Sequence, residues 1–154
     1  MNSYRLAINM EWTSKCNARC VMCPQSEIQN PMLMKPETFD QVLLRLRDAN
    51  IFRVVIAGYG EPTTHPSFKT FINKVREHPV HFDMVSNGHL LDEEKIRHLD
   101  GAIGTLVVSF SSIDPAVYRK VHVNLDHEQV KENILLAQKL LKTTKLAISL
   151  TPLP

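Results

Sequence analysis

The sequence predicts an α/β protein built on a parallel β-sheet, and two observations support this prediction. Five short, apolar runs alternate along the chain with stretches whose apolar residues recur at the spacing of one helix face. Strict alternation of this kind favours parallel strands that are joined by crossover helices. The chain has 154 residues, 44% of them hydrophobic and 22% charged, which suggests one domain over 1–154 with a real core.

Charge and hydropathy argue against two classes of partner. The net charge of +2 is too small, and the basic residues are too scattered, to indicate a nucleic-acid-binding protein. No apolar run approaches the ~20 residues of a membrane span, so we expect no membrane partner. The first residues lack the basic and apolar regions of a secretion signal. We therefore expect a cytoplasmic, reducing location, where grouped cysteines indicate metal binding or catalysis.

The first half of the chain contains two expected strands and two expected helices. A strand over 5–12 leads into a cysteine-containing loop, and the proline-containing stretch 24–35 is typical of irregular structure. A helix over 36–50 follows, because proline is tolerated in a first turn and apolar residues then recur at helical spacing. The run 52–57 indicates a buried strand, and a second helix is expected over about 66–78.

The second half continues the alternation with three strands and two helices. The expected strands are 81–86, 105–110 and 145–150, and the expected helices are 92–99 and 126–142. The stretch 111–115 is typical of a cap and a turn, and its aspartate, Asp114, is best explained as a helix cap.

Four polar or glycine-rich stretches each follow an expected strand. They are the cysteine loop, the loop 58–62, the turn 86–88 and the stretch 109–112. Because ligand sites of parallel α/β proteins form beyond the carboxyl ends of the strands, we expect the four stretches to meet at one edge of the sheet. This convergence predicts a functional site there.

All three cysteines of the chain lie in the first of these stretches. Cys16, Cys20 and Cys23 have the spacing C-x3-C-x2-C. Three thiolates on one short loop have the number and type to hold a metal cluster and to leave one corner open. An electron-transfer [4Fe-4S] cluster takes four protein ligands, so an open corner indicates a catalytic centre.

Other interpretations of the cysteines remain open at this point. A zinc site needs a fourth ligand, and the nearest histidine in the sequence is the distant His65. The chain would then be a zinc- or cluster-binding interaction module without catalysis. A disulfide, buried structural thiols and an electron-transfer centre are further possibilities. The seven histidines show no tight metal-binding pattern, and we interpret them as surface or capping residues.

The cysteine motif and the Gly-Glu-Pro triplet at 60–62 resemble those of the radical S-adenosylmethionine (radical SAM) superfamily, and the similarity covers essentially the whole chain. A looser similarity of 20–24 and 86–91 points to members with an additional SPASM- or twitch-type cluster domain. The resemblance implies a partial (β/α)6, TIM-like barrel. Since that barrel normally has a sixth strand, we expect this core domain to be truncated after about five β/α units.

The resemblance also implies an activity. Cys16, Cys20 and Cys23 would hold a [4Fe-4S] cluster whose open iron is chelated by S-adenosylmethionine (SAM). Reductive cleavage of SAM would give a 5′-deoxyadenosyl radical that abstracts hydrogen from a substrate, as in an oxidoreductase or a transferase. A flavodoxin- or ferredoxin-like protein would supply the electron. The substrate would be a small molecule or a peptide, and no catalytic residue toward it is identified.

Five further residues are candidates for binding the cofactor. Gly60 lets the backbone approach the ligand, and Glu61 offers an anionic acceptor to the ammonium group of SAM. Ser86 and Ser109 end two strands, where their hydroxyls would meet the ligand or cap the strand ends. Met22 takes the place of an aromatic residue common in the family and would cover the adenine.

Overall fold

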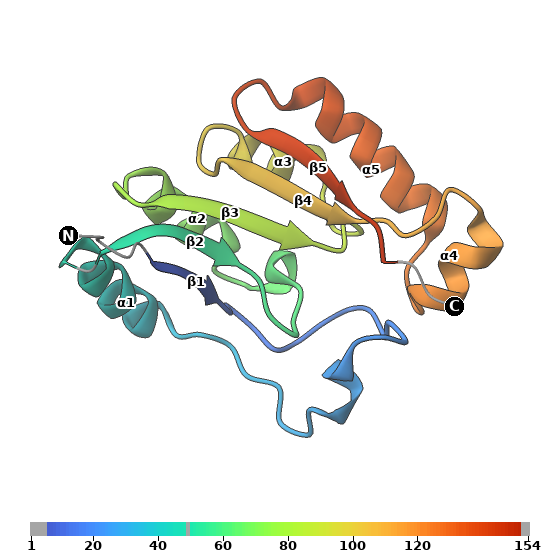
Figure 1. The fold of residues 1–154 in the computed structure, drawn as a ribbon, viewed down its shortest axis with the longest axis horizontal. Helices are drawn as coiled ribbons and strands as arrows, with labels where there is room; N and C mark the ends of the chain where they lie inside the picture. The colour runs from blue at the N-terminus through green and yellow to red at the C-terminus, as the bar shows by residue number, and fades with distance from the viewer. Residues whose placement is uncertain (1–5, 49, 152–154) are drawn as a thin grey trace.

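A computed structural model describes residues 6–48 and 50–151 and shows a five-stranded parallel β-sheet (Figure 1). The strands are β1 (Leu6–Met10), β2 (Ile51–Ile56), β3 (His81–Ser86), β4 (Thr105–Ser109) and β5 (Lys145–Ser149). The helices are α1 (Pro36–Asp48), α2 (Phe68–Arg76), α3 (Glu93–Leu99), α4 (Pro115–Val121) and α5 (His127–Leu140), with short 3-10 helices η1 (Pro24–Glu27) and η2 (Pro62–Thr64). The predicted α/β class and the five predicted strands are confirmed.

The strand order in the sheet is the order in the chain, β1-β2-β3-β4-β5. Each strand is parallel to the next, and right-handed crossovers therefore place the connecting helices on one face of the sheet. This is the arrangement of a partial, open barrel, as predicted. The carboxyl ends of all strands consequently point to the same edge, toward α4 and the cysteine loop (Figure 1).

The core lies between the sheet and the helices. Alternate strand residues that face the helices are fully buried, among them Val54, Ile56, Met84, Leu106 and Val108. The residues between them on β2 and β4 are half-buried, since they face the open, concave side of the sheet.

An aromatic cluster fixes the chain where it leaves β1. Trp12 is 1% exposed, and its ring meets Phe39 of α1 at a centroid distance of 5.7 Å and Phe71 of α2 at 5.3 Å. Phe39 and Phe71 stack on each other at 4.0 Å. Such edge and stacked contacts add to the gain from burial, so the cluster anchors the start of the cysteine loop on two helices.

Several predicted boundaries differ from the structure. The first strand, expected over 5–12, ends at Met10, and Arg5 lies outside the described residues. The helix expected over 36–50 ends at Asp48, and residue 49 is again outside the described part. The helix expected over 66–78 is shorter, Phe68–Arg76, because Pro66 and Ser67 form its entry turn. The stretch 24–35 contains the short helix η1.

Helix α4 was not predicted. The sequence pattern indicates a turn over 111–115 and no helix in the residues that follow. In the structure Pro115 begins a seven-residue helix, and the Asp114 side chain caps it by accepting hydrogen bonds from the N–H of Ala116 (2.7 Å) and Val117 (3.4 Å). The capping role of Asp114 is therefore confirmed. Two turns are too short to show a helical period, which explains the omission.

In the described ranges, no helix combines the length and the apolar character that crossing a membrane requires.

Candidate functional site

A pocket of about 260 Å³ lies at the carboxyl edge of the sheet. It is lined by Cys16, Ala18, Cys20, Met22, Cys23, Ala57, Gly58, Tyr59, Gly60, Glu61, Val85, Ser86, Asn87, Ser109, His122 and Thr151. All eight residues singled out from the sequence are among them. The four polar stretches thus converge on one cavity, as the strand pattern predicts.

The cysteine loop is held in place by backbone hydrogen bonds to two other segments. Its residues Arg19 and Val21 donate their N–H groups to the carbonyls of Val123 (2.9 Å) and Val121 (3.0 Å), at the end of α4. On the other side, the N–H of Glu61 donates to the carbonyl of Lys15 (2.9 Å). The end of the unpredicted helix α4 therefore supports the cysteine loop on one side.

The three cysteines are free, half-buried thiols. Burial raises the pKa of Cys16, and it raises the pKa of Cys20 to about 11. A metal binds the thiolate form, so binding a metal at Cys16 and Cys20 releases their protons.

The three thiols line the pocket together. Within the described residues, no three His, Cys, Asp or Glu side chains lie close enough to hold one metal ion. Ligands of a four-iron cluster each bind a different iron, so they stand further apart than ligands of one zinc ion. The three thiols facing a common pocket match the cluster interpretation.

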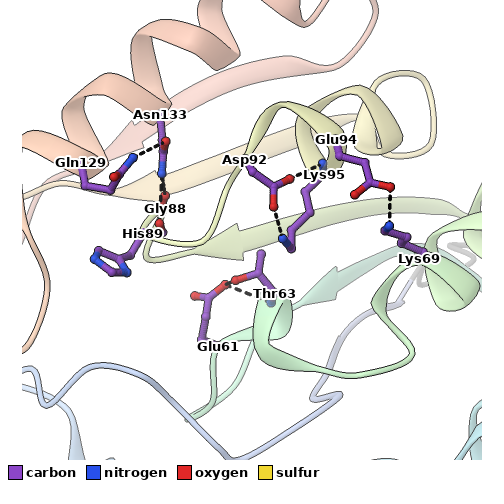
Figure 2. Close-up of polar contacts among 10 residues, drawn as sticks. All are labelled: Glu61, Thr63, Lys69, Gly88, His89, Asp92, Glu94, Lys95, Gln129 and Asn133. Carbon is purple, nitrogen blue, oxygen red and sulfur yellow. Dashed lines mark hydrogen bonds and ion pairs between the residues drawn. The ribbon is translucent and has the colours of Figure 1, made fainter.

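Glu61 is a buried carboxylate of the site, with 3% of its surface exposed. Its Oε1 accepts three hydrogen bonds, from the N–H of Thr63 (3.1 Å), the hydroxyl of Thr63 (2.6 Å) and the hydroxyl of Ser86 (2.8 Å). Figure 2 shows the pair with Thr63. Its Oε2 accepts one, from the N–H of Asn87 (2.7 Å). Burial raises the pKa of this carboxyl despite these donors.

Ser86 and Ser109 differ in what their hydroxyls do. The Ser86 hydroxyl donates to Glu61 and accepts the N–H of Gly88 (3.0 Å), so it orients the carboxylate and caps the end of β3. The Ser109 hydroxyl lines the pocket and makes no hydrogen bond within the described part of the chain. Of the two roles left open for these serines, capping suits Ser86 and a free pocket hydroxyl suits Ser109.

Gly60 is needed because two loops of the protein touch at this point. A Cβ at Gly60 would lie 1.9 Å from the carbonyl oxygen of Thr13 and 2.7 Å from that of Lys15. The side chain of Glu11 holds the same loop by accepting the N–H of Tyr59 (2.5 Å) and of Gly60 (3.3 Å). Gly60 was expected to let the backbone approach the ligand. In the structure it lets the backbone of this loop approach the backbone of the cysteine loop.

Asn87 has a second role that the sequence did not reveal. Its Oδ1 accepts the N–H of His89 (3.0 Å), as expected of a turn residue. Its Nδ2 also donates to Asn17 Oδ1 (2.8 Å) and lies 3.9 Å from Cys16 Sγ. Asn133 of α5 anchors this turn by donating to the carbonyls of Gly88 (2.9 Å) and His89 (3.0 Å), as Figure 2 shows.

Four of the seven histidines are buried, so a surface position is wrong for them, whereas His65 and His122 do occupy the C-cap positions of η2 and α4. His65, His78, His122 and His127 are 1–9% exposed. His122 is a pocket residue whose Nδ1 lies 3.4 Å from Cys20 Sγ, across 102 positions of sequence. No local pattern reveals such a contact, since it depends on the placement of α4.

Comparison with known proteins decides the family. A family model described as the radical SAM superfamily matches residues 10–152. The chain belongs to the radical SAM superfamily. Proteins of this family use a [4Fe-4S] cluster and SAM.

The curated relatives that match this chain have different names. A tungsten-containing aldehyde ferredoxin oxidoreductase cofactor-modifying protein of Pyrococcus furiosus is 32% identical over 66% of this chain and 29% of its own length. A probable GTP 3′,8-cyclase of Methanococcus maripaludis is 24% identical over 87% of this chain and 44% of its own. The chain thus spans less than half the length of these relatives.

Solved structures confirm the fold. Streptococcus suis SuiB bound to its precursor peptide SuiA superposes with a TM-score of 0.78 at 19% identity, over 99% of this chain and 34% of that one. anSMEcpe with bound AdoMet and the Cp18Cys peptide gives a TM-score of 0.77 at 21% identity, over 94% and 42%. The five-stranded partial barrel is therefore an architecture shared with proteins solved in complex with SAM.

Proposed function

We propose that this chain is the SAM-cleaving core of a radical SAM enzyme. The observation that carries the proposal is the convergence of Cys16, Cys20 and Cys23 with the loop around Glu61 on one pocket at the carboxyl edge of the sheet. On this proposal the residues 1–154 form one core domain.

The three cysteines are assigned as the ligands of a [4Fe-4S] cluster. When bound, the cluster supplies one electron that splits SAM into methionine and a 5′-deoxyadenosyl radical, which takes a hydrogen atom from the substrate. The cysteine loop is hydrogen-bonded to residues 121–123 and to Glu61. These hydrogen bonds keep the thiols at the pocket. The residue Met22, 38% exposed on this loop, is assigned to cover the adenine.

Glu61 is assigned to the ammonium group of SAM. Its Oε1 already accepts three hydrogen bonds, whereas Oε2 accepts one and retains a free acceptor position. Oε2 is therefore the oxygen that receives the ammonium, while Ser86 and Thr63 fix the carboxylate. Ser109 is assigned to the carboxylate or the ribose of SAM, since its hydroxyl is free of partners among the described residues.

Partners of the reaction are proposed only by class. A flavodoxin- or ferredoxin-like protein would deliver the electron, and a cytoplasmic location would keep the thiols reduced. The substrate is a small molecule or a peptide. The relatives named above modify a cofactor or cyclise GTP by name, and SuiB was solved with a peptide, so the family match assigns no single substrate.

Metal analysis after anaerobic reconstitution tests the proposal. We expect about four iron and four sulfide per wild-type chain, and loss of normal cluster assembly in Cys16→Ala, Cys20→Ala and Cys23→Ala. The exposed neighbour Val21 (59% exposed) provides the control, since Val21→Ala leaves all three ligands in place. One equivalent of zinc instead, or a full iron complement in the three cysteine variants, would refute the assignment and favour an interaction module.

A further inference from the structure

His122 sits against one of the three cysteines. It follows the last residue of α4 and is 1% exposed. Its Nδ1 lies 3.4 Å from Cys20 Sγ, and its Nε2 lies 2.9 Å from Ser111 Oγ. The ring of Tyr118 lies beside the imidazole at a centroid distance of 4.6 Å and limits its rotation. The imidazole is therefore fixed between the cysteine loop and the end of β4.

The chemistry of the neighbours sets the direction of these hydrogen bonds. A cysteine that ligates iron is a thiolate, which accepts hydrogen bonds and has none to donate, so the proton must be on Nδ1. In the neutral ring Nε2 is then an acceptor, and it accepts a hydrogen bond from the Ser111 hydroxyl.

Ser111 in turn is oriented by the chain after β5. Its Oγ accepts the N–H of Thr151 (3.4 Å), which leaves its own O–H for His122. These groups form a chain of hydrogen bonds, from the Thr151 amide through the Ser111 hydroxyl and the His122 imidazole to Cys20 Sγ. The thiolate at one end of these hydrogen bonds requires the proton on Nδ1, and a Ser111 hydroxyl that donates to Nε2 favours the same tautomer of His122.

We propose that His122 donates its Nδ1–H to Cys20 Sγ and thereby raises the reduction potential of the cluster that Cys20 binds. The inference rests on the proposed function. Reduction adds negative charge to the cluster and its sulfurs, so a hydrogen bond to a ligand sulfur stabilises the reduced state more than the oxidised one. His122 acts through Cys20 and is a positioning residue. Ser111 is a second one, because it fixes the tautomer.

The test is a redox titration of the reconstituted protein, followed by EPR, in three variants. His122→Phe keeps a ring but has no donor, and we expect reduction to become up to about tenfold less favourable, which is ~59 mV for one electron. His122→Asn places an amide near the position of Nδ1, and we expect it to restore most of the wild-type potential. Ser111→Ala should shift the potential in the same direction as His122→Phe, by a smaller amount, because the ring is then free to adopt the other tautomer.

His127 offers a matched control in the same group of rings. It is 3% exposed and packs on Tyr118 at 5.1 Å, and its Nδ1 pairs with Glu128 rather than with a cysteine. His127→Phe therefore disturbs the same packing without removing a donor to Cys20, and its potential should equal that of the wild type. ENDOR of the reduced cluster should show one exchangeable proton fewer in His122→Phe alone.

The outcomes separate this inference from the proposed function. An unchanged potential in His122→Phe, or an equal shift in His127→Phe, overturns the role of His122 while the cluster itself is intact. If His122→Phe does not retain a cluster, Ser111→Ala decides, and an unshifted potential there overturns the inference. Failure of the wild type to bind a cluster would instead refute the proposed function.

Discussion

Glu61 is a buried carboxylate whose four protein donors leave one acceptor position for a ligand. Its two oxygens are not equivalent, because Oε1 accepts from Thr63 and Ser86 whereas Oε2 accepts only the Asn87 amide among the described residues. A charge-assisted hydrogen bond contributes about 1.5–3 kcal/mol, and a neutral one about half as much. Because of this difference, removing the charge of Glu61 should change the affinity for SAM by a measurable amount.

Glu61→Gln should weaken SAM binding about five- to thirtyfold and leave iron and sulfide unchanged. The amide keeps the shape but removes the charge, and its NH2 group would face the Asn87 N–H if its oxygen replaced Oε1. The expected loss is ~1–2 kcal/mol. Titration of the reconstituted protein with SAM, followed by EPR, measures the affinity.

An exposed carboxylate of the cysteine-proximal helix η1 provides the control for this substitution. Glu27→Gln removes a charge near the loop without touching the pocket lining and should bind SAM like the wild type. Equal affinities of Glu61→Gln and wild type would remove Glu61 from the ligand site. Loss of the cluster in Glu61→Gln would mean that its role is structural.

Sequence analysis predicts the site residues whose role follows from a local motif. It misses the site residues whose role depends on tertiary packing. The cysteines and Glu61 stand in short motifs after strands, so their position in the pocket was predictable. His122 reaches Cys20 across 102 positions, and its helix is too short to show a period. Asn87 was recognised as a turn residue, but its contact with Cys16 depends on how two loops meet.

At the scale of elements, the contact between the cysteine loop and the loop after β2 positions the site. The strands were predictable because each is a short apolar run, and the loops because glycine and proline interrupt the pattern. How closely two loops approach each other is a tertiary property. The structure shows that approach at Gly60, whose missing Cβ makes room for the Thr13 carbonyl.

Gly60→Ala should destabilise the protein and impair cluster assembly, because the added Cβ would lie 1.9 Å from backbone that cannot move aside alone. Gly58→Ala is the comparison variant, since its Cβ would meet only the side chain of Glu11, which can rotate away at the cost of its hydrogen bonds to Tyr59 and Gly60. We expect a loss of about 1–3 kcal/mol in the first variant and less in the second. Thermal unfolding and iron content measure both. Equal stability of the two variants would contradict the close loop contact.

At the scale of the whole molecule, the described sheet is open. β1 and β5 each pair with one neighbour in the described ranges, and apolar side chains stand exposed on the last strand and after it. Ile148 of β5 is 43% exposed and Leu150 is 67% exposed. An unpaired strand with apolar side chains is a template for association with another chain.

A protein of these 154 residues should therefore self-associate at high concentration, and Ile148→Lys should reduce the association. Leu135→Lys adds the same charge at an exposed leucine (56%) of α5, away from the strand edge, and should have a smaller effect. Sedimentation velocity measures the result. A monomeric wild type at high concentration would show that the open sheet is not a site of association.

Product analysis tests the central claim most directly. The reconstituted protein is incubated anaerobically with SAM and dithionite, and 5′-deoxyadenosine and methionine are quantified by chromatography. We expect both products from the wild type and from Val21→Ala, and neither above background from Cys23→Ala, because the pocket then lacks one of its three thiolates. A wild-type protein that carries a complete cluster but forms no 5′-deoxyadenosine would contradict the assignment of this pocket as a SAM-cleaving site.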